Sequence, residues 1–204
     1  MFRLFKSRNF VIFWFGEMVS VIGDHISLIA FPWLVLQMTG SATLTGLVFA
    51  VQGIPRAILM LAGGAVVDRT SPRLVMLVTN ALRFFLVMFV AYMINQDTVD
   101  LVSVFLMAFT FGVADAFFYP ASTSIIPSIV SRDQLQAGNA IVQTTIHLGM
   151  TLGPVIAGLI IAGEIDSINH QSEATAGALQ AVNSYEQDRE GLARAFFVDG
   201  LTFG

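Results

Sequence analysis

The sequence predicts an all-α integral membrane protein, and three observations lead to this fold class. Only 12% of the residues are charged, 55% are hydrophobic, and the mean hydropathy is +0.76. An ordinary soluble domain carries about 25% charged residues, because its surface faces water. Several apolar runs reach the length of about 20 residues that a helix needs to cross a bilayer. Lys and Arg are also divided unevenly among the connecting segments, as in a chain with a fixed orientation.

The apolar runs predict five spanning helices and the start of a sixth, which together form one transmembrane unit over residues 1–204. The start of the chain has the basic flank of a signal peptide, but the apolar run behind it exceeds the roughly 7–15 residues of a signal peptide. We therefore expect a retained first helix. The expected spans are about 10–36, 44–67, 74–94, 101–126 and 140–162, and the sixth helix starts within 195–204.

The basic residues of the connecting segments predict the orientation, because cytoplasmic loops carry an excess of Lys and Arg. On the opposite side, only Arg189 and Arg194 occur, within the acidic stretch 164–194. We expect a multi-pass protein of the cell membrane with a cytoplasmic N-terminus. The stretch 164–194 is then an extracytoplasmic loop that could contain a short amphipathic helix. The six basic residues on the cytoplasmic side are Arg3, Lys6, Arg8, Arg69, Arg73 and Arg132.

Composition argues against several other classes of protein. The ten basic residues are scattered, whereas a nucleic-acid partner would require a clustered basic face. The chain has no cysteine, so it has neither disulfides nor thiolate chemistry. It also lacks a serine elbow, a metal motif and a recognisable pair of catalytic aspartates. We therefore expect no enzyme activity, no metal and no bound cofactor, and we expect the bilayer and a small molecule as partners.

Ionisable residues within the expected spans are the strongest functional signal. A charge near mid-membrane costs about 2.5–3.5 kcal/mol, so such residues face a bundle interior or a watery cavity. Glu17 and Asp24 lie seven positions apart and share one helix face. We predict that Asp24 first, and Glu17 second, binds a proton or a cationic substrate, with Arg56 or Arg83 as counter-charge. Static ion pairs that fix helix register are the alternative. The set within the spans is Glu17, Asp24, Arg56, Arg83, Asp115 and His147.

Two histidines carry a weaker signal. Neither stands in a paired spacing that would indicate a metal site. We expect His147 to be a packed, hydrogen-bonded core residue. His25, beside Asp24 in the first span, is evenly balanced between a structural and a functional role.

Two motifs carry a resemblance to a known family. Residues 64–73 read GAVVDRTSPR, and Gly64, Asp68, Arg69 and Arg73 match the cytoplasmic signature of the major facilitator superfamily; Ser71 and Pro72 depart from it. A positive-inside loop is the simpler interpretation of these residues. The fifth span resembles the glycine-proline signature of antiporters in that superfamily, although Ala140 replaces an earlier glycine. Its matching residues, which generic helix packing would also explain, are Gly149, Gly153, Pro154 and Gly158.

Longer segments resemble the macrolide and enterobactin exporter branch. They include FGEMVSVIGD in the first span and ADAFFYPASTSIIPSIV in the fourth. The resemblance implies the N-terminal six-helix repeat of a twelve-helix fold, in which two halves rock about a central substrate. It also implies proton-coupled export of small lipophilic or siderophore-like molecules, gating by the two motifs, and a partner that supplies the missing half. The alternatives are a non-transporting fragment or assembly partner, and an uptake carrier.

Overall fold

The computed structural model describes residues 4–162 and 178–203, and almost all of them are helical. Five of the helices are long and apolar enough to cross a membrane. This confirms the predicted all-α integral membrane fold. The elements in chain order are η1 (Leu4–Lys6), α1 (Arg8–Thr39), α2 (Ala42–Arg69), α3 (Pro72–Asn95), α4 (Leu101–Ile129), η2 (Arg132–Gln134), α5 (Leu135–Ala162) and α7 (Ala178–Phe203).

Short, well-capped connections separate the long helices. Gly40 ends α1 in the left-handed conformation that glycine adopts without strain, and its N–H donates to the Leu36 carbonyl at 2.7 Å. The side chain of Ser41 then accepts from the backbone N–H of Leu44 at the start of α2. Asp100 caps α4 in the same way, by accepting from the Ser103 N–H. These tight connections reverse the direction of the chain, while the most extensive helix contacts join α2 to α4, α3 to α7 and α1 to α5.

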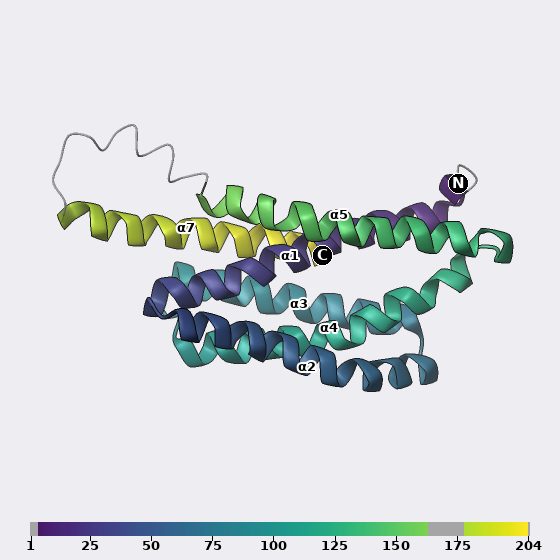
Figure 1. The fold of residues 1–204 in the computed structure, drawn as a ribbon, viewed down its shortest axis with the longest axis horizontal. Helices are drawn as coiled ribbons and strands as arrows, with labels where there is room; N and C mark the ends of the chain where they lie inside the picture. The colour runs from purple at the N-terminus through teal and green to yellow at the C-terminus, as the bar shows by residue number, and fades with distance from the viewer. Residues whose placement is uncertain (1–3, 163–177, 204) are drawn as a thin grey trace.

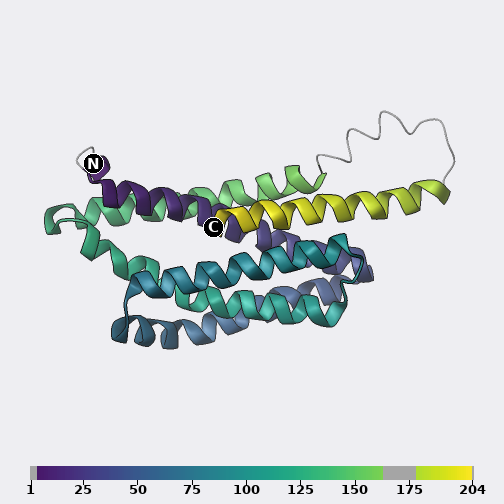
Figure 2. The ribbon, with the colours of Figure 1, turned by 180° about the vertical axis from the view of Figure 1, so that it is seen from behind.

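The helices form two groups that lie side by side (Figures 1 and 2). One group contains α1, α5 and α7, and the other contains α2, α3 and α4. An apolar core joins them where α7 meets α1, α3 and α4. At its centre, the ring of Phe31 on α1 lies 5.0 Å from Phe196 on α7 and 6.0 Å from Phe111 on α4, between ring centroids. Outward-facing apolar side chains such as Leu61 and Val102 are strongly exposed, as expected of a surface that faces lipid.

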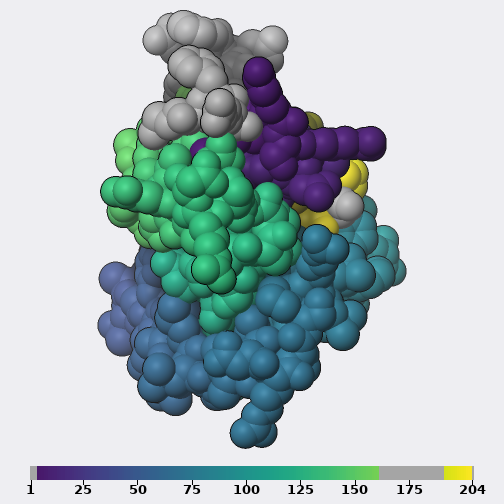
Figure 3. All heavy atoms as spheres, turned by 90° about the vertical axis from the view of Figure 1, so that its right-hand side faces the viewer, coloured from purple at the N-terminus to yellow at the C-terminus, as the bar shows by residue number. Residues whose placement is uncertain are grey.

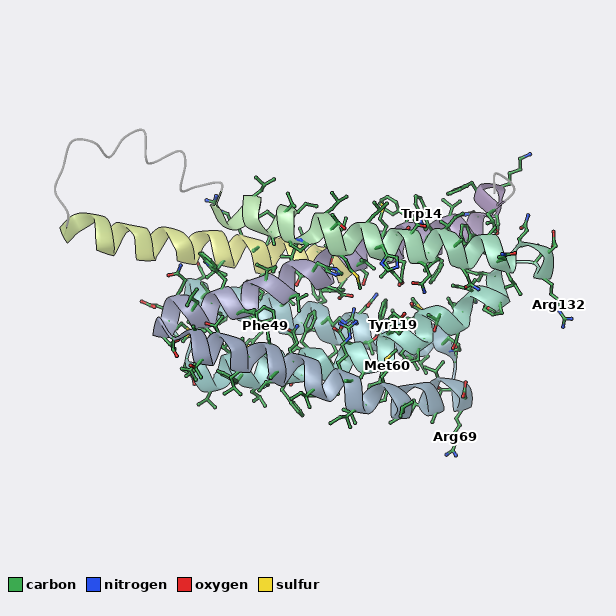
Figure 4. The ribbon with its side chains drawn as sticks, in the orientation of Figure 1. Trp14, Phe49, Met60, Arg69, Tyr119 and Arg132 are labelled. Carbon is green, nitrogen blue, oxygen red and sulfur yellow. The ribbon has the colours of Figure 1, made fainter. Side chains whose placement is uncertain are left out.

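One end of the bundle collects the basic connecting segments. The N-terminus, the α2–α3 connection and the α4–α5 connection all lie there, and Figure 3 looks onto this end. Arg69 and Arg132 project from it (Figure 4). Residues 164–177 of the expected loop 164–194 lie outside the described residues. From Ala178 onward that stretch is helical and continues without a break into the expected sixth helix, so both belong to α7.

Two glycines that the sequence did not single out set the distance between α2 and α4. A methyl group at Gly112 would overlap the carbonyl oxygen of Gln52, and one at Gly63 would overlap the carbonyl oxygen of Ala116. Both obstacles are backbone atoms, which cannot move aside as a flexible side chain can. Small residues of this kind let helix backbones approach closely within a membrane.

We therefore expect Gly112→Ala and Gly63→Ala to lower the free energy of unfolding by about 1–3 kcal/mol, the usual cost of overpacking. Gly53→Ala on α2 is the matched control, because a methyl group there meets nothing within 4 Å. This control should be neutral or slightly stabilising, since alanine favours helix over glycine. Reversible unfolding in detergent measures all three. Equal effects at Gly53 and Gly112 would show that close packing does not govern this contact.

Candidate functional site

A cavity of about 360 Å³ lies between the two helix groups and is lined by α1 to α5. Phe49 of α2 and Tyr119 of α4 lie in the space between α2 and α4 on one side and α1 and α5 on the other (Figure 4). Apolar and aromatic side chains make up much of the wall, and ionisable groups from five helices interrupt it. A cavity of this size and mixed lining fits a small organic molecule. Its charged and imidazole-bearing residues are Glu17, Asp24, His25, Arg56, Arg83, Asp115 and His147.

Arg83 is the centre of the charged group. Its side chain is only 1% exposed, and its guanidinium bonds Asp24 Oδ1 through Nη1 at 3.0 Å and Asp115 Oδ1 through Nη2 at 2.5 Å. The ring of Phe118 lies against the same guanidinium, with its centroid 4.3 Å from Cζ. A planar cation with several donors suits this arrangement better than lysine would. One side chain of α3 therefore connects α1 and α4.

Arg56 is the second cation and is much more accessible. Its side chain is 46% exposed, and its Nη1 lies 3.5 Å from Asp115 Oδ2. The sequence predicted Arg56 or Arg83 as the counter-charge of Asp24. The structure brings Arg83 to Asp24 and brings Arg56 to Asp115. Four helices, α1 to α4, thus contribute to one connected network of ion pairs.

Glu17 lies on the same cavity wall as Asp24, as the shared helix face predicted. It is buried, and its Oε1 accepts from Ser122 Oγ at 3.0 Å. Its Oε2 has no hydrogen-bond partner among the described residues. The wall therefore carries three carboxylates and two guanidinium groups. Because an uncompensated buried charge is expensive, a proton or a cationic group would balance this excess.

The two histidines both line the cavity. His25 is half-buried, and its Nδ1 donates to the Val21 carbonyl at 2.7 Å. The prediction that His147 is a packed core residue is wrong, because α5 presents this side chain to the cavity and leaves it exposed. Within the described residues, no group of three or more His, Cys, Asp or Glu side chains is placed to hold a metal ion.

The predicted gating glycines of α5 divide into two kinds. A methyl group at Gly149 would overlap the Val21 side chain, and one at Gly153 would overlap Cβ of His25. Close packing of α5 on α1 therefore explains these two. Gly158 has nothing within 4 Å of such a methyl group, so packing does not explain it here. Pro154 lies inside α5, where it removes one helical hydrogen bond.

The predicted loop signature lies at the basic end of the bundle. Asp68 and Arg69 end α2, Arg73 is in the first turn of α3, and all three are exposed. Gly64 has open space beside it. The helix dipole disfavours an acid at a helix C-terminus, so an external partner would stabilise Asp68. The ion pairs of the described residues do not include it.

Sequence reasoning missed one buried acid, Asp199 on α7. It is fully buried and accepts a hydrogen bond from Ser27 Oγ. The signal was the same as for Asp24, an acid inside an apolar run (AFFVDGLTF). Ser122, the partner of Glu17, carried no such signal, because serine and threonine are common in membrane helices.

The fold and the cavity define a multi-pass helical membrane protein with a buried ion-pair network on the wall of a central cavity. This chain belongs to the Major Facilitator Superfamily, whose sequence model matches residues 13–166. The prediction of the superfamily is therefore confirmed, and the relatives described next bear out the predicted resemblance to its exporters.

The similar proteins are named as transporters. The multidrug efflux pump Tap of Mycolicibacterium fortuitum is 32% identical over 154 residues, which are 72% of this chain and 37% of the relative. Tap of Mycobacterium tuberculosis H37Rv is also 32% identical, over 36% of its length. The enterobactin exporter EntS of Shigella boydii is 25% identical over 153 residues, 72% of this chain and 35% of the relative. The match thus spans little more than a third of the curated relatives. No solved structure matches this chain.

Proposed function

We propose that this chain is the N-terminal half of a secondary transporter that exports small molecules in exchange for protons. The observation that carries the proposal is Arg83, held between Asp24 and Asp115 on the wall of the cavity. Loading a proton onto either acid weakens its ion pair, and releasing the proton restores it. Such a group of competing acids and one buried cation is suited to coupling proton binding to the arrangement of α1, α3 and α4.

The proton gradient is the proposed energy source, and small lipophilic or siderophore-like molecules are the proposed substrates. The names of Tap and EntS, a multidrug pump and an enterobactin exporter, support export. The aromatic lining, including Phe49, Phe118 and Tyr119, supports a lipophilic substrate. The excess of carboxylates on the wall favours molecules that bear a positive charge.

A second half is the proposed partner, either in the same polypeptide, in a separate chain or in a second copy. Transporters with paired repeats hold the substrate between them, and one repeat rocks against the other. The signature residues Gly64, Asp68, Arg69 and Arg73 and the α5 residues Gly149, Gly153, Pro154 and Gly158 are proposed to gate that motion. The collection of basic residues at one end supports a cytoplasmic N-terminus in the cell membrane.

The test is an efflux assay on an efflux-deficient bacterium that expresses the product of the complete gene. We expect several-fold faster loss of preloaded ethidium, a lipophilic cation, than from cells with empty vector. A protonophore should abolish the difference. Enterobactin release, measured in parallel, separates a drug-like from a siderophore-like substrate.

Other outcomes decide between the alternatives. Faster accumulation of dye in energised cells would indicate an uptake carrier. Normal membrane expression with no movement of either compound in either direction would contradict export and leave an assembly role. Efflux that survives the protonophore would contradict proton coupling. Efflux by residues 1–204 alone would contradict the requirement for a second half.

A further inference from the structure

Asp199 is the most deeply buried acid of the structure that lies away from the cavity. Its side chain is 0% exposed, and the cavity wall does not include it. Ser27 Oγ donates to its Oδ2, and Thr202 Oγ1 lies 3.5 Å from its Oδ1. The ion pairs recorded among the described residues do not include Asp199. Thr202 Oγ1 donates its proton to the Asp199 backbone carbonyl at 2.6 Å, so Ser27 is the hydroxyl donor to this carboxyl group.

Asp199 and Asp24 lie at adjacent faces of α1, because Ser27, which bonds Asp199, is three positions after Asp24. A methyl group at Gly23 would overlap both Asp199 and Thr202, so α7 lies directly on the small-residue face formed by Gly23 and Ser27. The next residue, Asp24, instead faces Arg83 and the cavity. The cavity wall therefore includes Asp24 and does not include Asp199.

Among the described residues, the charged groups around Asp199 do not include a cation that pairs with it alone. The helices packed on α7 are α1, α3 and α5. On α1 the neighbouring charge is Asp24; on α3 it is Arg83, which already bonds Asp24 and Asp115. Asp115 on α4 adds a further negative charge at longer range. The titratable side chain of α5, His147, lies on the cavity wall.

We propose that Asp199 is a second proton-binding site, buried outside the cavity wall and hydrogen-bonded by Ser27. The step is the reversible addition of one proton to a carboxylate oxygen. The protonated form of the Asp199 side chain carries no charge. It is therefore favoured in the membrane interior, where an unpaired charge is costly. Within the described residues, Asp199 is not part of a group of three or more His, Cys, Asp or Glu side chains that could hold a metal ion.

This inference rests on the proposed function and adds a coupling step to it. Loss of the proton from Asp199 places a second negative charge near Asp24 and Asp115. That charge favours protonation of Asp24 or a separation of α7 from α1. Access to Asp199 requires α7 to move off Gly23 and Ser27, so proton exchange there is expected only when α7 separates from α1.

The test is infrared difference spectroscopy of the purified chain in lipid vesicles, titrated with pH. We expect a carbonyl band of a protonated carboxylic acid that Asp199→Asn removes and that exposed Asp100→Asn leaves unchanged. Ser27→Ala should shift this band, because it removes the hydroxyl donor, and it tests the site without altering the acid. Ser20→Ala, at another buried serine of α1, is the matched control and should not shift it.

Two results would overturn the proposal. One is a spectrum in which Asp199→Asn removes no protonated-acid band at any pH although circular dichroism shows a folded chain. The other is a band that disappears when sodium replaces potassium, which would assign the site to a metal ion. The spectroscopy does not depend on transport. If the infrared band is present but the cells show no efflux, the proposed function is contradicted. The proposed proton-binding site at Asp199 is then still supported.

Discussion

Arg83→Met is expected to destabilise the chain by about 3–5 kcal/mol, the cost of removing one partner of a buried ion pair. Methionine preserves length and apolar contact with Phe118, so the loss is mainly electrostatic. Two carboxyl groups, Asp24 and Asp115, would lose the cation that each contacts within 3.0 Å. Reversible unfolding in mixed detergent measures this change. Membrane yield should fall in parallel.

Arg56→Met is the matched control for this prediction. Its guanidinium is 46% exposed and makes one contact at 3.5 Å with Asp115. Exposed pairs of this kind contribute about 0–1 kcal/mol. Arg83→Met combined with Asp115→Leu should be less destabilised than Arg83→Met alone, because one unpaired acid is removed with the cation. Equal destabilisation by the two arginine variants would contradict the central role of Arg83.

The fold was largely predictable because the bilayer restricts the choices. Long apolar runs can satisfy their backbone hydrogen bonds in a membrane only as helices or closed barrels. The apolar runs therefore predicted α1 to α5 well. The start of α7 was not predictable from hydropathy, because residues 178–194 are polar and helical at once. Hydropathy locates membrane spans, whereas a helix that extends beyond the membrane has no apolar signal.

The importance of the cavity acids could be predicted from the energetic cost of a charge in the membrane. Their pairing with particular arginines could not be predicted. A charge in an apolar run is costly enough to imply a role, which led to Glu17, Asp24 and Asp115. Which arginine meets which acid depends on how α2, α3 and α4 are rotated about their axes. Contacts through Gly63 and Gly112 help to set that rotation, and neither glycine lies in a motif that stands out from the sequence.

The ion-pair network and the glycine contacts have different physical consequences for movement. Arg83 connects α1 to α3 and α4 by directional bonds that a proton can weaken. Gly149 and Gly153 pack α5 against α1 through close contacts that carry no charge. Proton binding should therefore loosen α1 from α3 and α4 while α1 and α5 remain together. The helices expected to stay together, α1 and α5, belong to one helix group, whereas α3 and α4 belong to the other. The expected movement is therefore between these two pairs of helices, at the cavity.

Asp24→Asn is expected to reduce export against a concentration gradient to the level of empty vector while membrane expression persists. Asparagine keeps the size of the side chain and one carbonyl oxygen for Arg83 Nη1, which lies 3.0 Å from Asp24 Oδ1. It cannot take up or release a proton. The loss should therefore be one of coupling and not of folding. Dye efflux from energised cells, measured with quantitative immunoblotting, checks this result.

Downhill movement separates the coupling role of Asp24 from a static one. If Asp24 loads a proton, Asp24→Asn should still pass dye down its gradient and should no longer respond to a protonophore. If the Asp24–Arg83 pair only fixes helix register, the variant should lose stability, downhill movement and uphill export together. Asp100→Asn is the control, because asparagine also caps a helix and Asp100 lies outside the spans. Unchanged uphill export by Asp24→Asn would contradict the assignment, since a side chain that cannot ionise would then support coupling.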